Sequence, residues 1–168
     1  MIISPNHRRS TSAVFIAAMT MFASLLAPAA GAGEPIVVVV NPGSPVDEVT
    51  SAVLKDIYLG KEGSIGGSPA APANYKSNTP IRNAFEKQMM GTDPEDVNKH
   101  WKSQKFLGFG DNQPVIMGSP EAIKKFVARQ KGAIGYVPLS LVDGTVHLVK
   151  RVNGRDVTNA AGYPYQAP

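Results

Sequence analysis

The chain has 168 residues, 43% of them hydrophobic and 18% charged, which suits one compact domain with a core of its own. It contains no cysteine, and this excludes a disulfide scaffold, a thiolate metal site and a cysteine nucleophile. Its 17 lysines and arginines are scattered rather than interleaved with aromatic residues, so no nucleic-acid-binding stripe is predicted.

The first 32 residues have the pattern of a secretory signal peptide. A basic head at His7–Arg9 precedes an apolar run over residues 13–26 and a small-residue stretch that ends at Ala32. The apolar run is shorter than the about 20 residues that span a bilayer. We therefore predict a cleaved leader over residues 1–32, a periplasmic or secreted protein, and no stable membrane span. Cleavage after Ala29 and an uncleaved anchor are the alternatives.

The chain after the leader alternates between strand-like and helix-like segments. Ile36–Val40 is a continuous β-branched run, typical of strands buried on both faces, as in parallel sheets. Further strands are predicted over residues 73–75, 133–137 and 145–150, with a loop over residues 63–72. Helices are predicted over residues 50–58, 80–90 and 120–131, and from residue 94 onward.

Three of these helices share one type of start, a capping side chain followed by proline at the first helical position. The pairs are Thr79-Pro80, Asp93-Pro94 and Ser119-Pro120. Strands that alternate with helices favour an α/β domain with a largely parallel sheet. We place this domain at residues 33–152 and expect residues 153–168 to form a tail on its surface.

The polar segment Lys76-Ser77-Asn78-Thr79 is the candidate binding site, because it follows a predicted strand and opens a predicted helix. Ligands of α/β sheets bind beyond the carboxyl ends of strands, and helix N-termini offer N–H groups to anions. The Ser77 and Thr79 hydroxyls could add donors, and Lys76 a positive charge. The alternative is a capped helix start that binds no ligand.

No other pattern indicates catalysis or metal binding. His100 reads as an exposed helical residue, and His147 as a structural residue of a strand. The acids at residues 93–96 occupy a first helical turn, where the helix dipole already accounts for them. The glycines at residues 108–110 form neither a G-x-G-x-x-G nor a P-loop motif. The sequence therefore predicts a protein that is not an enzyme and holds no metal or cofactor.

Two phrases resemble phosphate-binding proteins of ABC transporters. Leu54–Lys61, which follows the first strand, is similar to a helix that ends in D-I-F/Y-x-G-K, and Gly132–Val137 is similar to a G-A-I-G-Y-V strand. Both occur in the family's order, and the resemblance covers roughly residues 36–149. It implies a type II periplasmic-binding-protein-like fold. Because the family has two lobes and is about twice as long, the chain is expected to form a single lobe, with a largely parallel or mixed sheet flanked by helices.

The resemblance also implies a ligand site. The family's R-S-x-x-S-G-T-like turn holds phosphate, and its counterpart here is Lys76-Ser77-Asn78-Thr79. This turn is shorter, lacks the Ser-Gly pair, and is followed by Pro80, which has no N–H group. The implied partners are phosphate or a similar small anion, bound weakly by a monomer, and an ABC permease or a second chain that completes the cleft.

Two functions follow as expectations. The first is an exported, solute-binding type of protein that binds phosphate or another oxyanion. The alternative is an envelope module for protein–protein interaction, built on the same lobe and without a ligand.

Overall fold

The computed structural model describes Met1 and residues 33–159 and 162–168. The predicted signal peptide and its cleavage site lie outside the described residues. Residues 33–168 fall in one compact unit, which contains all the buried hydrophobic residues of the described chain. Within that described part, no helix combines the length and the apolar content that a membrane crossing requires.

A five-stranded sheet forms the centre of the domain, in the order β6-β5-β7-β1-β8. Its strands are β1 (Ile36–Val40), β5 (Ala71–Tyr75), β6 (Val115–Met117), β7 (Ala133–Pro138) and β8 (His147–Leu148). β5 runs parallel to β6 and β7, whereas β1 is antiparallel to β7 and β8. The sheet is therefore mixed, with a parallel half and an antiparallel half.

All five side chains of β1 are buried, as the β-branched run predicts. The antiparallel pairing on both sides of β1 differs from the parallel neighbours that such a run suggests. The continuous burial reflects elements that cover both faces of the sheet, and this coverage does not depend on strand direction.

Helices cover both faces of the sheet. Helix α4 (Pro120–Arg129) packs on β7, β1 and β5, and a Cβ added to Gly135 of β7 would lie 2.5 Å from Ile123 Cγ2. Tyr136, the next residue of β7, points to the opposite face, because side chains alternate along a strand. There its ring meets Phe85 and Tyr58. The domain is thus an α/β structure with helices on each side of the sheet.

The remaining helices are α1 (Ser51–Tyr58), α2 (Pro80–Ala84) and α3 (Pro94–Phe106). Helix α2 continues directly as a π-helical segment, η1 (Phe85–Met89). The predicted caps are confirmed at Asp93 and Ser119, whose side chains accept hydrogen bonds from the amides of Glu95 and Ala122 at 2.8 and 3.2 Å. Thr79 occupies the N-cap position of α2, but its side chain makes no capping hydrogen bond.

Short elements complete the domain. A hairpin of β3 (Ser64–Ile65) and β4 (Ser68–Pro69) lies within the predicted loop. β2 (Glu48–Val49), β9 (Arg151–Val152) and β10 (Arg155–Asp156) form a small sheet, and η2 (Gly110–Asn112) and η3 (Leu139–Leu141) are 3-10 turns. The strand predicted over residues 145–150 is reduced to the two residues of β8.

The segment expected to form a surface tail packs against the core instead. Val157, Tyr163 and Tyr165 are buried, and the Ile36 amide donates a hydrogen bond of 2.9 Å to the carbonyl of Tyr165. The expectation was wrong because it rested on the polar and glycine-rich composition of the segment as a whole. Burial of these three side chains is favourable, since it removes apolar surface from water.

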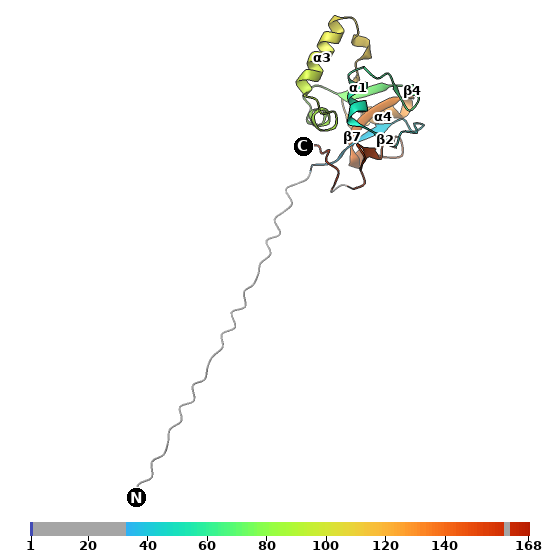
Figure 1. Cartoon of the computed structure of the whole chain (residues 1–168). Helices are drawn as coiled ribbons and strands as arrows, with labels where there is room; N and C mark the ends of the chain where they lie inside the picture. The colour runs from blue at the N-terminus through green and yellow to red at the C-terminus, as the bar shows by residue number, and fades with distance from the viewer. Residues whose placement is uncertain (2–32, 160–161) are drawn as a thin grey trace. The chain divides into compact units, whose positions relative to one another are not determined.

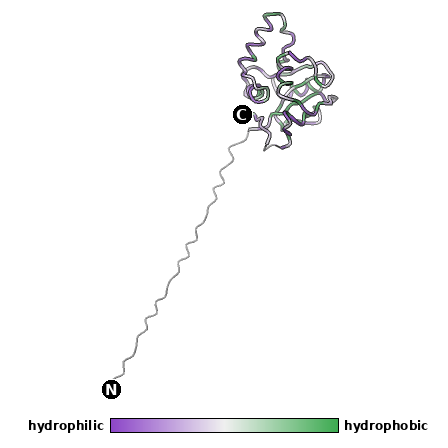
Figure 2. Tube along the Cα trace, in the orientation of Figure 1, coloured by the Kyte–Doolittle hydropathy of each residue, from purple (hydrophilic) through white to green (hydrophobic). Residues whose placement is uncertain are grey.

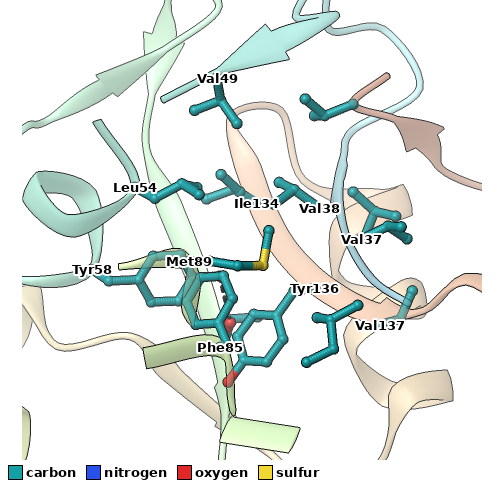
Figure 3. Packing of buried hydrophobic residues seen from close by; sticks show 14 of the residues in the cluster. Val37, Val38, Val49, Leu54, Tyr58, Phe85, Met89, Ile134, Tyr136 and Val137 are labelled. Carbon is teal, nitrogen blue, oxygen red and sulfur yellow. Dashed lines mark hydrogen bonds between the residues drawn. The ribbon is translucent and has the colours of Figure 1, made fainter. Parts of the chain in front are cut away.

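An aromatic cluster fills the core between the sheet and the α1/η1 side. The rings of Phe85 and Tyr136 stack with centroids 3.7 Å apart and an angle of 4° between their planes. Tyr58 lies against Phe85 at 4.9 Å. Figure 3 shows these three rings together, with Met89 beside them. The Tyr58 hydroxyl donates to the carbonyl of Ala73 at 3.0 Å, so its polar group is satisfied inside the core.

Candidate functional site

The predicted turn lies at the carboxyl end of β5, where the chain leaves the sheet and enters α2. Lys76, Ser77 and Asn78 are exposed, and Thr79 is half-buried. Asn78 has a φ of 66°, in the left-handed region that asparagine adopts more readily than most residues. The parallel strand β6 ends beside β5, so the turn occupies the type of position where α/β sheets bind ligands.

The turn uses its hydroxyl groups within the protein. Thr79 Oγ1 donates to the carbonyl of Lys76 at 3.0 Å, and Ser77 Oγ donates to Asn98 Oδ1 at 3.2 Å. Pro80, at the first position of α2, has no N–H group to offer. Donors for an anion at this place must therefore come largely from neighbouring residues.

Arg82 holds the turn in place from inside the domain. It is only 3% exposed, and its Nη1 donates to the carbonyl of Tyr75 at 3.0 Å and to Ser77 Oγ at 3.2 Å. Its Nη2 donates to Asn98 Oδ1 of α3 at 3.2 Å. One guanidinium group thereby connects the end of β5, the turn and α3.

The charge of Arg82 is balanced by Glu86, four residues further along the same helical segment. Arg82 Nε lies 2.7 Å from Glu86 Oε1, and the Glu86 side chain is buried. Burial raises the pKa of Glu86, while the charge of Arg82 and its hydrogen bond act in the opposite direction. The pair neutralises two charges in a place where either alone would be costly.

A hollow of about 370 Å³ lies between the turn and α3. It is lined by Ser77, Asn78, Asn98, Trp101, Lys102, Lys105 and Gln113. The two lysines are the only charged residues in this lining, so the hollow is positive. Asn98 Oδ1 already accepts from Ser77 and Arg82, and its amide nitrogen is not used in that network. The lining thus presents ammonium and amide donors, a set that suits an oxyanion.

The structure brings part of the predicted site into this hollow. Ser77 and Asn78 line it, whereas Lys76 and Thr79 are not among its lining residues. Three lining residues of α3, Asn98, Lys102 and Lys105, were not predicted from the sequence. Their spacing in the sequence indicates that they belong together, because residues 98, 102 and 105 share one face of a helix. That spacing does not reveal which element the face meets.

Arg82 was also not predicted as part of the site, although the sequence contains a pattern that points to it. Arg82 and Glu86 stand four residues apart just after a polar turn, a spacing that places opposite charges side by side on a helix. Sequence alone gives no reason to bury such a pair, since most of them face solvent.

The two histidines that the structure describes, His100 and His147, have structural surroundings. His100 is half-buried rather than exposed as predicted, because its Nε2 lies 2.9 Å from the carbonyl oxygen of Leu59. His147 lies in β8 with its Nε2 2.9 Å from Asp47 Oδ1. Among the residues that the structure describes, no three histidine, cysteine or acidic side chains gather closely enough to hold a metal ion.

Comparison with solved structures identifies the fold. A protein of Clostridium perfringens, solved with bound phosphate and described as a phosphate ABC transporter substrate-binding protein, superimposes with a TM-score of 0.64 at 24% identity. An ABC-type phosphate transport receptor from Vibrio cholerae superimposes with a TM-score of 0.63 at 22% identity, and PstS from Borrelia burgdorferi with a TM-score of 0.58 at 14% identity. Each match covers 81% of this chain.

The matches cover only 53%, 54% and 55% of those three proteins, so this chain spans about half their length. No protein-family model and no curated protein matches the sequence. The likeness in structure agrees with the two sequence phrases and with the mixed α/β sheet. The chain therefore has the α/β fold of phosphate ABC transporter substrate-binding proteins, over about half of their length.

Proposed function

We propose that this protein binds phosphate or a similar oxyanion, without catalysing a reaction, in the hollow between the turn Lys76–Thr79 and α3. The observation that carries the proposal is the lining of that hollow, which combines two lysines with amide donors and contains no acid. Its position at the carboxyl end of β5, in a fold shared with phosphate transport receptors, supports the same ligand class.

Rigidity of the turn supports this proposal. Arg82 fixes Ser77 and Asn98 at the same time, so the two walls of the hollow are held at a set distance before any ligand arrives. A site that is organised in advance loses less freedom on binding. Arg82 itself is a positioning residue here, because its hydrogen bonds are made to the protein.

We expect weak binding by a single copy of the chain. About three charge-assisted hydrogen bonds contribute roughly 1.5–3 kcal/mol each. The loss of translational and rotational freedom opposes them by at least ~4 kcal/mol. The hollow is open to water, which screens the attraction between the lysines and the anion. A dissociation constant in the millimolar range follows, and tighter binding would require a second chain or partner over the open side.

Calorimetry with inorganic phosphate tests the proposal. We expect saturable heat for the protein from Gly33 onward, and a loss of affinity of about tenfold or more for Lys102→Gln/Lys105→Gln, since each lysine supplies a charged donor. The matched control is Lys87→Gln/Lys125→Gln, which removes two exposed lysines that do not line the hollow. Absence of heat at ~10 mM phosphate, or equal affinity of the Lys102/Lys105 variant and the wild type, would contradict the proposal.

The proposal includes export and a transport context. Residues 1–32 would be removed as a signal peptide, and the folded unit would act in the periplasm or outside the cell. An ABC permease, or a second chain that completes the cleft, would be its partner. Mass spectrometry of the protein recovered from the periplasm checks the first step, with cleavage after Ala32 or Ala29 as the expected result.

The alternative function is a ligand-free module for protein–protein interaction. It is favoured by the internal use of the Ser77 and Thr79 hydroxyls and by the missing N–H group of Pro80. Recovery of a specific envelope protein by an affinity-tagged domain that shows no phosphate heat would support this function. Saturable phosphate binding together with no recovered protein would reject it.

A further inference from the structure

The end of α3 and the turn that follows it carry the large apolar side chains with the highest exposed fractions in the described part of the folded unit. Phe106 is 91% exposed, Leu107 60% and Phe109 58%. We name residues 106–109 the apolar tip. In Figure 2, α3 is mostly hydrophilic along its length and turns hydrophobic at this end. In Figure 1, the same end of the helix lies at the outer edge of the domain, away from the sheet.

The backbone of the apolar tip is hydrogen-bonded to the last turn of α3. The amide of Leu107 donates to the carbonyl of Ser103 at 3.0 Å, and the amide of Phe109 donates to that of Gln104 at 2.8 Å. Gly108, with a φ of 86°, makes the reversal between them. A tip whose amides are already satisfied can enter an apolar phase at lower cost than an open loop.

Charge is distributed unevenly along α3. The acids Glu95 and Asp96 lie in the first turn, where Lys99 Nζ approaches Glu95 at 3.2 Å. Lys102 and Lys105 are exposed and precede the apolar tip by about one turn or less. The end of α3 that leads into the apolar tip is therefore basic.

We propose that the apolar tip docks on an anionic lipid surface. Phe106, Leu107 and Phe109 would enter the interface between headgroups and acyl chains, and Lys102 and Lys105 would face the lipid phosphates. Aromatic and aliphatic side chains backed by lysines are the features that hold a peripheral segment at such a surface. The proposal does not depend on phosphate binding in the hollow.

The size of the surface favours lipid over another protein. The three side chains expose on the order of 400 Å² in total, whereas a stable protein interface buries about 800 Å² on each partner. A small, projecting, apolar end needs no complementary pocket in order to enter a lipid interface. Charge complementarity between the two lysines and anionic headgroups would supply the remaining attraction.

Sedimentation with lipid vesicles tests the proposal, using the protein from Gly33 onward, because residues 33–168 contain the whole described core. We expect the wild type to sediment with phosphatidylcholine vesicles that contain about 30% phosphatidylglycerol, and much less with pure phosphatidylcholine. Phe106→Ser/Phe109→Ser should lower the partition coefficient by about tenfold or more. Lys102→Gln/Lys105→Gln should lower it by a similar factor and remove most of its salt dependence.

Val53→Ser is the matched control, since Val53 is 41% exposed on α1, away from the tip. It should sediment like the wild type. In calorimetry, Phe106→Ser/Phe109→Ser should bind inorganic phosphate with the same heat as the wild type. Failure of the lipid proposal and failure of phosphate binding therefore give different results. Wild type that stays in the supernatant, or a phenylalanine variant that sediments equally, would overturn the proposal. The proposal would also be overturned if the wild type formed a dimer that did not bind vesicles and that dissociated in the phenylalanine variant, since the tip would then join two copies of the chain.

Discussion

Arg82→Met is expected to lower the free energy of unfolding by about 3–5 kcal/mol at pH 7, because it leaves the buried carboxylate of Glu86 without its partner. The same change removes the hydrogen bonds from Arg82 to Tyr75, Ser77 and Asn98. Urea unfolding followed by circular dichroism measures the effect. Arg129→Met, a change at an exposed arginine of α4, should alter stability by less than about 0.5 kcal/mol.

The effect of Arg82→Met should depend on pH with a defined sign. Burial raises the pKa of Glu86 above its ordinary value of 4.5, and the charge of Arg82 opposes this shift. Without Arg82 the folded state holds the Glu86 proton more tightly, so stability falls as pH rises from about 4.5 through the raised pKa. The loss should be larger at pH 7 than at pH 4.5. Adding Glu86→Gln should restore part of the stability and remove this pH dependence; an equal loss at both pH values would contradict the interpretation.

Phe85→Ala is expected to destabilise the domain by about 3–5 kcal/mol, because Phe85 is fully buried and its ring stacks on Tyr136 and lies against Tyr58. The substitution leaves a cavity in the aromatic cluster between η1 and the sheet. Thermal unfolding should show the loss as a lower melting temperature.

Phe85→Leu is the matched control for this substitution. It keeps most of the apolar volume and should cost less than half as much as Phe85→Ala, since the cavity term is smaller. A similar loss for both variants would mean that the stacking geometry, rather than the buried volume, dominates at this position. Equal stability of Phe85→Ala and the wild type would contradict the packing described for the core.

The sequence was informative wherever local chemistry decided the structure. Asp93-Pro94 and Ser119-Pro120 set the starts of α3 and α4, because a capping side chain and a fixed proline φ act within one turn. The run Ile36–Val40 predicted the fully buried strand β1. The direction of its neighbours was not predictable, since antiparallel and parallel partners can leave the same side chains buried.

Elements that depend on distant partners were not predicted. β6 has only three residues, and its strand conformation comes from pairing with β5, about 40 residues earlier in the chain. The burial of Tyr163 and Tyr165 depends on the end of the chain returning to β1, where the Ile36 amide meets the Tyr165 carbonyl. Such contacts join segments far apart in sequence, and no local pattern encodes them.

The residues of the candidate site also separate into those that local sequence predicts and those that depend on tertiary packing. Ser77 and Asn78 were predicted because they stand between a strand and a helix, and the structure places them in the lining of the hollow. Lys102 and Lys105 were not found, because the angle at which α3 crosses the turn is set by tertiary packing. Val97 and Trp101 fix that packing by burying one face of α3. The exposed face of the helix then turns its lysines toward the predicted turn.

The most direct measurement is a phosphate titration followed by the backbone and side-chain amide resonances of the 15N-labelled protein from Gly33 onward. Binding in the hollow predicts saturable shifts, with a midpoint in the millimolar range, at Ser77, Asn78, Asn98, Lys102 and Lys105. It also predicts that Lys102→Gln/Lys105→Gln raises this midpoint by about tenfold or more. Resonances that stay fixed up to ~20 mM phosphate, or shifts confined to other parts of the domain, would contradict the assignment of this hollow as the anion site.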